Sequence, residues 1–200
     1  MTVAVPQFIS LMYVSKMFGA NGIVNGTLQS LGWIKTALPF WTDATWARVM
    51  VNILNIWVGN PYLMLMVPGS LMIIPADLYE SAKIDGAGPW QQYTKITLPY
   101  MLFITGPYLL TSFTGNMNNF NIIFLLSGGG PAMTDVSGVL GAPGETDLLV
   151  TWLFKMITTS EPAAYNLASV IGIMVFIVVA GISLVVYNVM PSIKNEEDFQ

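Results

Sequence analysis

The sequence predicts an all-α membrane protein of about four transmembrane helices with a helix–turn–helix loop on one side of the membrane. Composition is the first reason: 54% of the 200 residues are hydrophobic and 9% are charged, whereas soluble domains carry about 25% charged residues. The second is that three long segments, residues 49–76, 100–127 and 166–190, contain no charged side chain. The third is the polar stretch at residues 79–99, whose glycines and prolines indicate two short helices around a turn.

The residue types that are missing exclude several kinds of chemistry. The chain has no cysteine and no histidine, which excludes disulfides and metal sites built from these ligands. The run Ser127–Pro131 is rich in glycine but lacks the Lys-Ser/Thr pair that a phosphate-binding loop requires. The net charge of −4 argues against nucleic acid as a partner. We therefore expect a protein that is not an enzyme and that uses no cofactor and no metal.

The N-terminal part is expected to hold the end of one transmembrane helix followed by an interfacial loop. Residues 3–19 are apolar but contain Pro6 and Lys16, and the segment is shorter than the ~20 residues that cross a bilayer. We interpret it as the end of a transmembrane helix. Residues 20–44 are rich in Asn, Gly, Thr and Trp, which is typical of a loop with a short amphipathic helix at the membrane–water boundary.

The remaining segments alternate between spans and polar regions. Residues 49–76 and 100–127 are spans that contain asparagines and prolines, which we expect to face neighbouring helices or a water-filled cavity rather than lipid. Residues 132–161 carry charges and are expected in water or at the interface, with an amphipathic surface helix at Leu148–Ile157. Residues 166–190 form the last span, and residues 191–200 form a solvated tail.

The polar stretch between the two central spans carries helix signals in a fixed order. Asp77 is suited to cap a first helix, and Glu80 three residues later would complete a capping box. Gly86 suits the left-handed conformation that commonly ends a helix. Pro89 suits the first turn of a second helix, and Pro99 is expected to stop that helix before the next span. We expect a compact knob at a membrane surface.

This stretch resembles the EAA coupling loop in membrane subunits of binding-protein-dependent ABC importers. Their pattern is E-A-A, three variable residues, G, nine variable residues and I-x-L-P, and the one departure here is a serine in place of the first alanine. The resemblance implies that the loop docks on a cytoplasmic subunit that hydrolyses ATP. The residues that it assigns to this coupling are Glu80, Ser81, Ala82, Asp85, Gly86, Ile96, Leu98 and Pro99.

The likeness covers about residues 5–189 and points to the larger membrane subunit of maltose/maltodextrin importers. The segments that carry it are VPQFIS, GNPYLMLM, DGAGPWQQYTKITLP, MNNF, LLSGGGP and TDLLVTW. The resemblance implies that residues 1–190 are a C-terminal part of that subunit's transmembrane domain, with the coupling loop at residues 76–99 and a cytoplasmic tail at residues 191–200. Lys and Arg are spread evenly over both sides, so only the resemblance places the coupling loop in the cytoplasm.

The resemblance also implies a location and a set of partners. The location is the bacterial inner (plasma) membrane, in which the chain is multi-pass and surrounded by lipid. The partners are a dimer of cytoplasmic ATP-binding subunits, a second permease subunit and an extracytoplasmic sugar-binding protein.

A polar face in the second central span is the candidate substrate site. Ser112, Asn116 and Asn119 are spaced to share one face of a helix, and amides both donate and accept hydrogen bonds, as sugar hydroxyls do. The alternative is that these amides bond neighbouring helices. The family resemblance favours sugar: it places substrate contacts on Gly59, Tyr62, Ser112, Asn116 and Asn119. Gly115, beside this face, stands where some maltose importers carry an aromatic side chain, so we expect room for longer maltodextrins.

Three other functions stay open from the sequence. One is a permease of the same architecture for another solute, and another is a truncated membrane fragment or scaffold that transports nothing. The third, an ion-coupled carrier, is disfavoured because such a carrier is expected to keep a carboxylate or a lysine inside the membrane, and residues 49–76 and 100–127 contain no acidic or basic residue.

Overall fold

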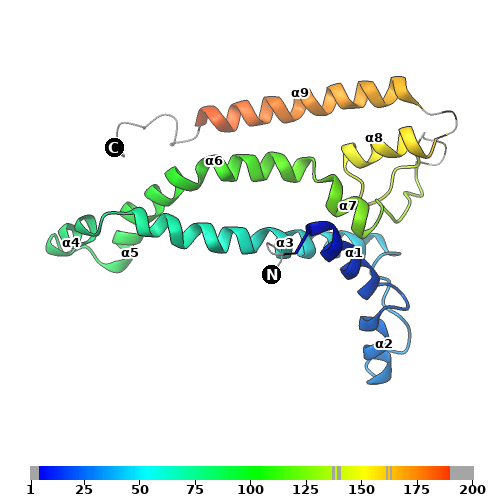
Figure 1. The fold of residues 1–200 in the computed structure, drawn as a ribbon, viewed down its shortest axis with the longest axis horizontal. Coiled ribbons are helices and arrows are strands. Elements are labelled where there is room, and N and C mark those ends of the chain that lie inside the picture. Colours follow the sequence, from blue (N-terminus) through cyan, green and yellow to red (C-terminus); the bar gives the residue numbers. More distant parts are fainter. Residues whose placement is uncertain (1–4, 137, 139–140, 161, 163, 190–200) are drawn as a thin grey trace. The chain divides into compact units, whose positions relative to one another are not determined.

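The computed structural model describes residues 5–136, 138, 141–160, 162 and 164–189. Their regular elements are helical, as predicted, apart from an isolated β-bridge between Ala132 and Gly144 (Figure 1). In chain order the elements are α1 (Gln7–Met17), α2 (Ile23–Ser30), α3 (Ala44–Ile73), α4 (Ala76–Ile84), α5 (Pro89–Gln92), the π-helical turn η1 (Tyr93–Thr97), α6 (Leu98–Met117), α7 (Phe120–Leu126), α8 (Leu149–Thr158) and α9 (Tyr165–Val189).

Three helices among the described residues are long and apolar enough to cross a membrane. They are α3, the continuous helix Pro89–Met117 that comprises α5, η1 and α6, and Tyr165–Asn188 of α9. About four spans were expected, and the difference lies at the N-terminus, where α1 has only 11 residues. Helix α3 runs through Pro61 and Pro68 without a break, which membrane helices tolerate because neighbouring groups satisfy the freed carbonyls.

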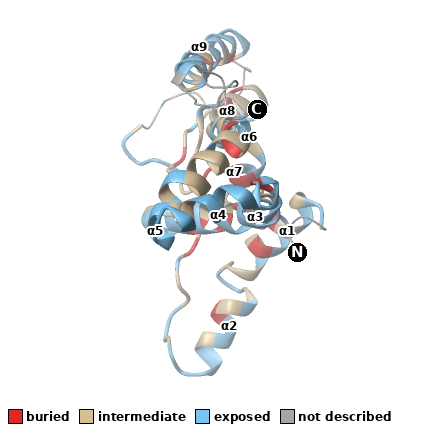
Figure 2. Cartoon of the chain, turned by 90° about the vertical axis from the view of Figure 1, so that its left-hand side faces the viewer, coloured by how far each residue is buried: buried red, intermediate tan, exposed pale blue. Residues whose placement is uncertain are grey.

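Large apolar side chains are exposed along these helices. In α9, Ile173, Phe176 and Val185 are 61%, 71% and 65% exposed, and Figure 2 shows this helix with few buried positions. In a soluble protein such a continuous apolar surface would be covered. It is therefore a surface for lipid or for partner subunits, in agreement with the predicted membrane protein.

The chain divides into two compact units. The first comprises residues 1–61 and 117–177, and the second comprises residues 62–116 and 178–200. In the first unit α1 packs against α7, and α7 against α8. Its core cluster consists of Leu11, Val14, Phe40, Met50, Leu54, Ile122, Ile123 and Leu126. A smaller cluster of Met156, Ala168 and Ile171 joins α8 to α9.

The loop before α3 in the first unit is fixed by one buried amide. The side chain of Asn25 in α2 is fully buried. It donates to the carbonyls of Gly19 and Leu38 at 3.1 and 3.2 Å and accepts from the Leu38 N–H at 2.8 Å. A buried amide with all these partners is stabilising, whereas an unpaired one is costly. The short helix predicted within residues 20–44 is thus present and anchored.

In the second unit, side chains of α6 contact both α3 and α9. The rings of Tyr62 in α3 and Tyr108 in α6 lie 4.9 Å apart, within the range of favourable aromatic pairs. The hydroxyls of Thr114 in α6 and Ser183 in α9 lie 3.3 Å apart. These contacts fix the rotation of α6 about its axis, and α6 is the helix that carries the candidate substrate side chains Ser112 and Asn116.

Candidate functional site

The coupling loop, residues 76–99, folds as two helices around a glycine turn, as predicted. Helix α4 ends at Ile84, and Gly86 follows with a φ of +77°. The Ala87 N–H reaches back to the Ala82 carbonyl at 2.8 Å, which is the bonding pattern of a glycine-terminated helix. Pro89 occupies the first position of α5, as expected. Local sequence signals were sufficient here because a turn of this kind depends on near neighbours alone.

Two side-chain amides fix the second half of this turn. The Gln91 Oε1 accepts from the Gly88 N–H at 3.1 Å, and the Gln92 Nε2 donates to the Ala87 carbonyl at 2.9 Å. Each bond is local and connects the turn to the first residues of α5. The coupling loop is therefore held in shape by its own hydrogen bonds, in the second unit of the chain.

The predicted start of α4 is wrong by two residues. Asp77 was expected to cap the helix with Glu80 as its capping-box partner, but α4 begins at Ala76 and Pro75 stands at the cap position without a side-chain bond. Pro75 has a φ of −59° and cannot donate a backbone hydrogen bond, so it suits the position that precedes a helix. Asp77 instead lies in the first turn, where its charge favours the positive end of the helix dipole.

The predicted stop at Pro99 is also wrong. The helix passes from α5 through η1 into α6, and Pro99 is the second residue of α6. In a regular α-helix the proline ring would meet the carbonyl of Lys95, four residues earlier. The π turn at Tyr93–Thr97 lies at this place, and the Leu98 N–H bonds to Tyr93, five residues earlier. A wider turn thus accommodates the proline that was expected to end the helix.

The end of the coupling loop presents apolar side chains to solvent. Ile84 is 86% exposed and Trp90 is 75% exposed, and the Trp90 ring lies 5.7 Å from the ring of Tyr93. Exposed tryptophans are frequent anchors of protein interfaces. Glu80, Ser81, Ala82 and Asp85 of the coupling motif lie on α4 and at its end, whereas Ile96 belongs to η1 and Leu98 opens α6.

The polar face of the second central span is shorter than predicted. Ser112 and Asn116 lie in α6, where the Asn116 amide donates to the Ser112 carbonyl at 2.8 Å. The helix ends at Met117, and a new helix, α7, begins at Phe120. Asn119 is therefore not on the same helix face, contrary to the expected spacing. The predicted single span at residues 100–127 is likewise two helices.

Asn119 has a structural role at this break, within the first unit. Its Oδ1 accepts from the Ile122 N–H at 3.4 Å, so it caps α7. Its Nδ2 donates to the Oδ1 of Asn55 in α3 at 3.3 Å. Asparagine is a favoured helix N-cap. The sequence analysis missed this role because the spacing of Asn119 from Ser112 and Asn116 suggested one continuous helix.

The other two candidate sugar residues lie on α3. A Cβ at Gly59 would meet no atom within 4 Å, so the backbone there is open to a ligand. Tyr62 is 49% exposed and packs against Tyr108, a residue that the sequence analysis did not select. The five candidates divide between the units: Gly59 and Asn119 belong to the first, and Tyr62, Ser112 and Asn116 to the second.

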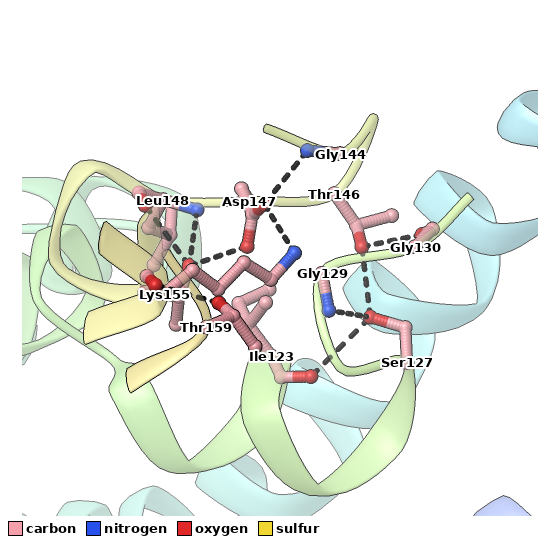
Figure 3. Close-up of polar contacts among 11 residues, drawn as sticks. Ile123, Ser127, Gly129, Gly130, Gly144, Thr146, Asp147, Leu148, Lys155 and Thr159 are labelled. Carbon is pink, nitrogen blue, oxygen red and sulfur yellow. Dashed lines mark hydrogen bonds and ion pairs between the residues drawn. The ribbon is translucent and has the colours of Figure 1, made fainter. Parts of the chain in front are cut away.

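A second polar cluster, in the first unit, was not predicted from the sequence (Figure 3). Asp147, whose side chain is 4% exposed, accepts from the Lys155 ammonium at 2.6 Å and from the Gly144 N–H at 2.7 Å. Its other oxygen accepts from Thr151 at 2.9 Å. This network connects the loop before α8 to α8 itself. The eight-residue spacing from Asp147 to Lys155 gives no motif, so only the fold reveals it.

The glycine run after α7 packs directly against this cluster. A Cβ at Gly129, which has a φ of +84°, would overlap with the Asp147 carboxylate and the Lys155 ammonium. Thr146 lies between the two loops: its hydroxyl contacts the Ser127 hydroxyl and the Gly130 carbonyl, both at 2.7 Å. The run Ser127–Pro131 is thus a packing site that requires glycine. It follows the short helix α7 rather than the end of a membrane span.

Comparison with known proteins places the chain in a family. Residues 1–194 match the family described as "Binding-protein-dependent transport system inner membrane component". The chain belongs to this family. It is therefore a multi-pass membrane component of a transport system, as its three long apolar helices also indicate.

Three similar proteins are named as sugar transport system permeases. The chain is 38% identical over 200 residues to the maltodextrin transport system permease protein MdxF of Bacillus subtilis, covering 97% of this chain and 45% of MdxF. It is 38% identical over 194 residues to the galactooligosaccharides transport system permease protein GanP of the same bacterium, covering 96% and 44%. With the maltose/maltodextrin transport system permease protein MalF of Escherichia coli it shares 39% over 184 residues, covering 91% and 35%. The chain spans less than half the length of these curated relatives.

Proposed function

We propose that this chain is part of the permease subunit of an ATP-driven importer that carries maltose- or maltodextrin-type sugars across the bacterial inner membrane. The observation that supports the transport role best is the geometry of the coupling loop. Its turn is held by internal hydrogen bonds, and Ile84 and Trp90 stand exposed at its end. A rigid, partly apolar surface is suited to dock in a groove of another protein.

The partner at this loop is a cytoplasmic ATP-binding subunit, and ATP is hydrolysed there rather than in this chain. The glycine run Ser127–Pro131 has no phosphate-binding lysine and instead packs against an ion pair. A second permease subunit and an extracytoplasmic sugar-binding protein complete the importer. The coupling loop then faces the cytoplasm. The predicted cytoplasmic tail, residues 191–200, lies outside the described residues.

The sugar specificity rests on neutral polar groups in the spans. Residues 49–76 and 100–127 contain amides, hydroxyls and aromatic rings but no charge, which matches a neutral solute rich in hydroxyls. We assign substrate contact to Gly59, Tyr62, Ser112, Asn116 and Asn119. An asparagine amide offers two donors and two acceptor sites, which suits it to bind sugar hydroxyls.

The experiment that tests this proposal is co-purification followed by uptake. The tagged subunit should bring down an ATP-binding subunit and a second permease, and the reconstituted complex should take up maltodextrins only with ATP and the binding protein. Trp90→Ala should reduce recovery of the ATP-binding subunit several-fold. Trp33→Ala is the matched control, because Trp33 is 76% exposed but lies in the loop before α3. A subunit that purifies alone, or equal effects of both substitutions, would contradict the proposal.

A second candidate substrate is a galactooligosaccharide. GanP of Bacillus subtilis, named for such sugars, is as similar to this chain as the maltodextrin permease MdxF, at 38% identity each. The polar groups in the spans suit both sugars, which differ in hydroxyl stereochemistry and linkage rather than charge. Uptake of maltotriose and of a galactotriose by the same complex distinguishes the two substrates. Uptake of the true substrate should saturate at a low sugar concentration, and uptake of the other should not.

A further inference from the structure

We propose that the hydrogen bond between Tyr79 and Thr97 transmits force from the coupling loop to α6 and so couples ATP hydrolysis to transport. The hydroxyl of Tyr79 in α4 lies 2.9 Å from the hydroxyl of Thr97, the last residue of η1. Both side chains are half-buried, within the second unit. This inference rests on the proposed function, because it assumes that an ATP-binding subunit pushes on the coupling loop.

The π turn lies between Trp90 and α6, so force transmission to α6 benefits from a contact that crosses it. Between the coupling loop and α6 the chain passes through Tyr93–Thr97, where the backbone bonds span five residues instead of four. π turns occur mostly as single turns at functional sites, and helices bend at them. Pro99 follows at once and provides no backbone donor. A force applied at Trp90 would therefore be partly absorbed by bending at η1 before reaching α6.

The Tyr79–Thr97 bond connects the coupling loop to the far end of the π turn η1. It links α4, on the other side of the Gly86 turn, to the end of η1. With this bond in place, the two helices of the coupling loop and the first turn of α6 move together. Since Ser112 and Asn116 lie farther along α6, movement of its first turn is communicated to the proposed sugar site. Tyr79 and Thr97 are thus positioning residues, which contact neither nucleotide nor sugar.

The test measures ATP hydrolysed per sugar transported in the complete reconstituted importer. Tyr79→Phe removes only the hydroxyl, and Thr97→Val replaces the hydroxyl by a methyl group of similar size. Each substitution should raise the ratio of ATP to sugar about two- to tenfold, the range that one net hydrogen bond supports. Recovery of the ATP-binding subunit should be unchanged. The double variant should be no worse than either single variant, because all three remove the same bond.

Two controls separate this effect from a loss of folding. Tyr93→Phe removes a hydroxyl from another tyrosine of the coupling loop, whose ring packs on Trp90, and should leave the ratio unchanged. Thr97→Ser keeps the hydroxyl and should restore coupling. If Tyr79→Phe and Thr97→Val co-purify with the ATP-binding subunit and keep the wild-type ratio, the inference fails while the proposed function stands. If the wild-type chain recovers no ATP-binding subunit, the proposed function itself fails.

Discussion

Gly86 adopts a backbone conformation that side chains disfavour, and this gives the coupling loop its shape. Its φ is +77°, whereas nothing lies within 4 Å of a Cβ built there. Space is therefore available, and the constraint comes from the backbone alone. Gly88, two residues away, has a φ of −70° and equally open surroundings. The pair separates the effect of backbone conformation from that of added volume.

Gly86→Val should therefore uncouple transport, and Gly88→Val should not. A β-branched residue in the left-handed region costs about 1–2 kcal/mol, so the turn is expected to open and the loop to lose its fit to the ATP-binding subunit. We expect sugar uptake to fall about tenfold while membrane insertion stays normal. Uptake and ATP hydrolysis in the reconstituted importer are the measurements. Wild-type coupling in Gly86→Val contradicts the role assigned to this turn.

Asn116→Ala should weaken sugar transport without affecting assembly. Losing an amide that bonds a sugar hydroxyl should cost about 1–3 kcal/mol, seen as a rise in the sugar concentration needed for half-maximal uptake. Asn188→Ala is a matched control, because the Asn188 amide in α9 also donates to the carbonyl four residues earlier, at 2.9 Å. Equal uptake defects in the two variants would contradict the proposed contact between Asn116 and the sugar.

Gly115→Phe should shift the preference of the importer towards shorter sugars. A Cβ at Gly115 would have no atom within 4 Å, so a side chain can begin there, beside Asn116, without a clash. The wild type should transport maltotetraose as well as maltose, and the variant should lose the longer sugar selectively. Uptake of both sugars by both proteins is the measurement. An unchanged length preference would show that Gly115 serves helix packing alone.

Among the elements, those governed by local signals were predicted best. The Gly86 turn, the start at Pro89 and the apolar spans follow from neighbouring residues. The break between α6 and α7 and the π turn before Pro99 were missed. Asn119 caps α7 where the sequence predicted a continuous helix, and a π turn precedes Pro99 where the sequence predicted a stop. The candidate sugar residues came from family resemblance, and their mutual placement depends on packing between helices.

Helix α8 gives a prediction at the same scale. Asp147→Ala leaves Lys155, whose side chain is 22% exposed, without its carboxylate, and it also removes the acceptor for the Gly144 N–H. Breaking a largely buried pair costs about 3 kcal/mol. Glu145→Ala, which breaks the exposed pair with Arg48, should cost less than about 1 kcal/mol. Thermal unfolding of the importer and protease sensitivity of the loop before α8 measure the difference. Equal destabilisation by the two substitutions would contradict the structural importance assigned to the Asp147–Lys155 pair.

At the scale of the whole molecule, the order of the spans determines which segments share a side of the membrane. With α3, α6 and α9 as the helices that cross the membrane, the coupling loop and the end of α9 are on one side. The loops between α7 and α9 and before α3 are on the other. Charge does not decide this topology, because Lys and Arg are distributed evenly between the two sides. The arrangement follows only from the number of crossings.

Cysteine labelling tests this topology without background, since the chain has no cysteine of its own. Gln91→Cys in α5, Thr134→Cys after α7 and Asn188→Cys at the end of α9 are all at exposed positions. In intact cells a membrane-impermeant maleimide should label Thr134→Cys alone, because the other two positions face the cytoplasm in the proposed orientation. In inverted membrane vesicles the pattern should reverse. Labelling of Thr134→Cys and Gln91→Cys from the same side would show that the helix at Pro89–Met117 does not cross the membrane, and both the topology and the proposed sugar path would then be wrong.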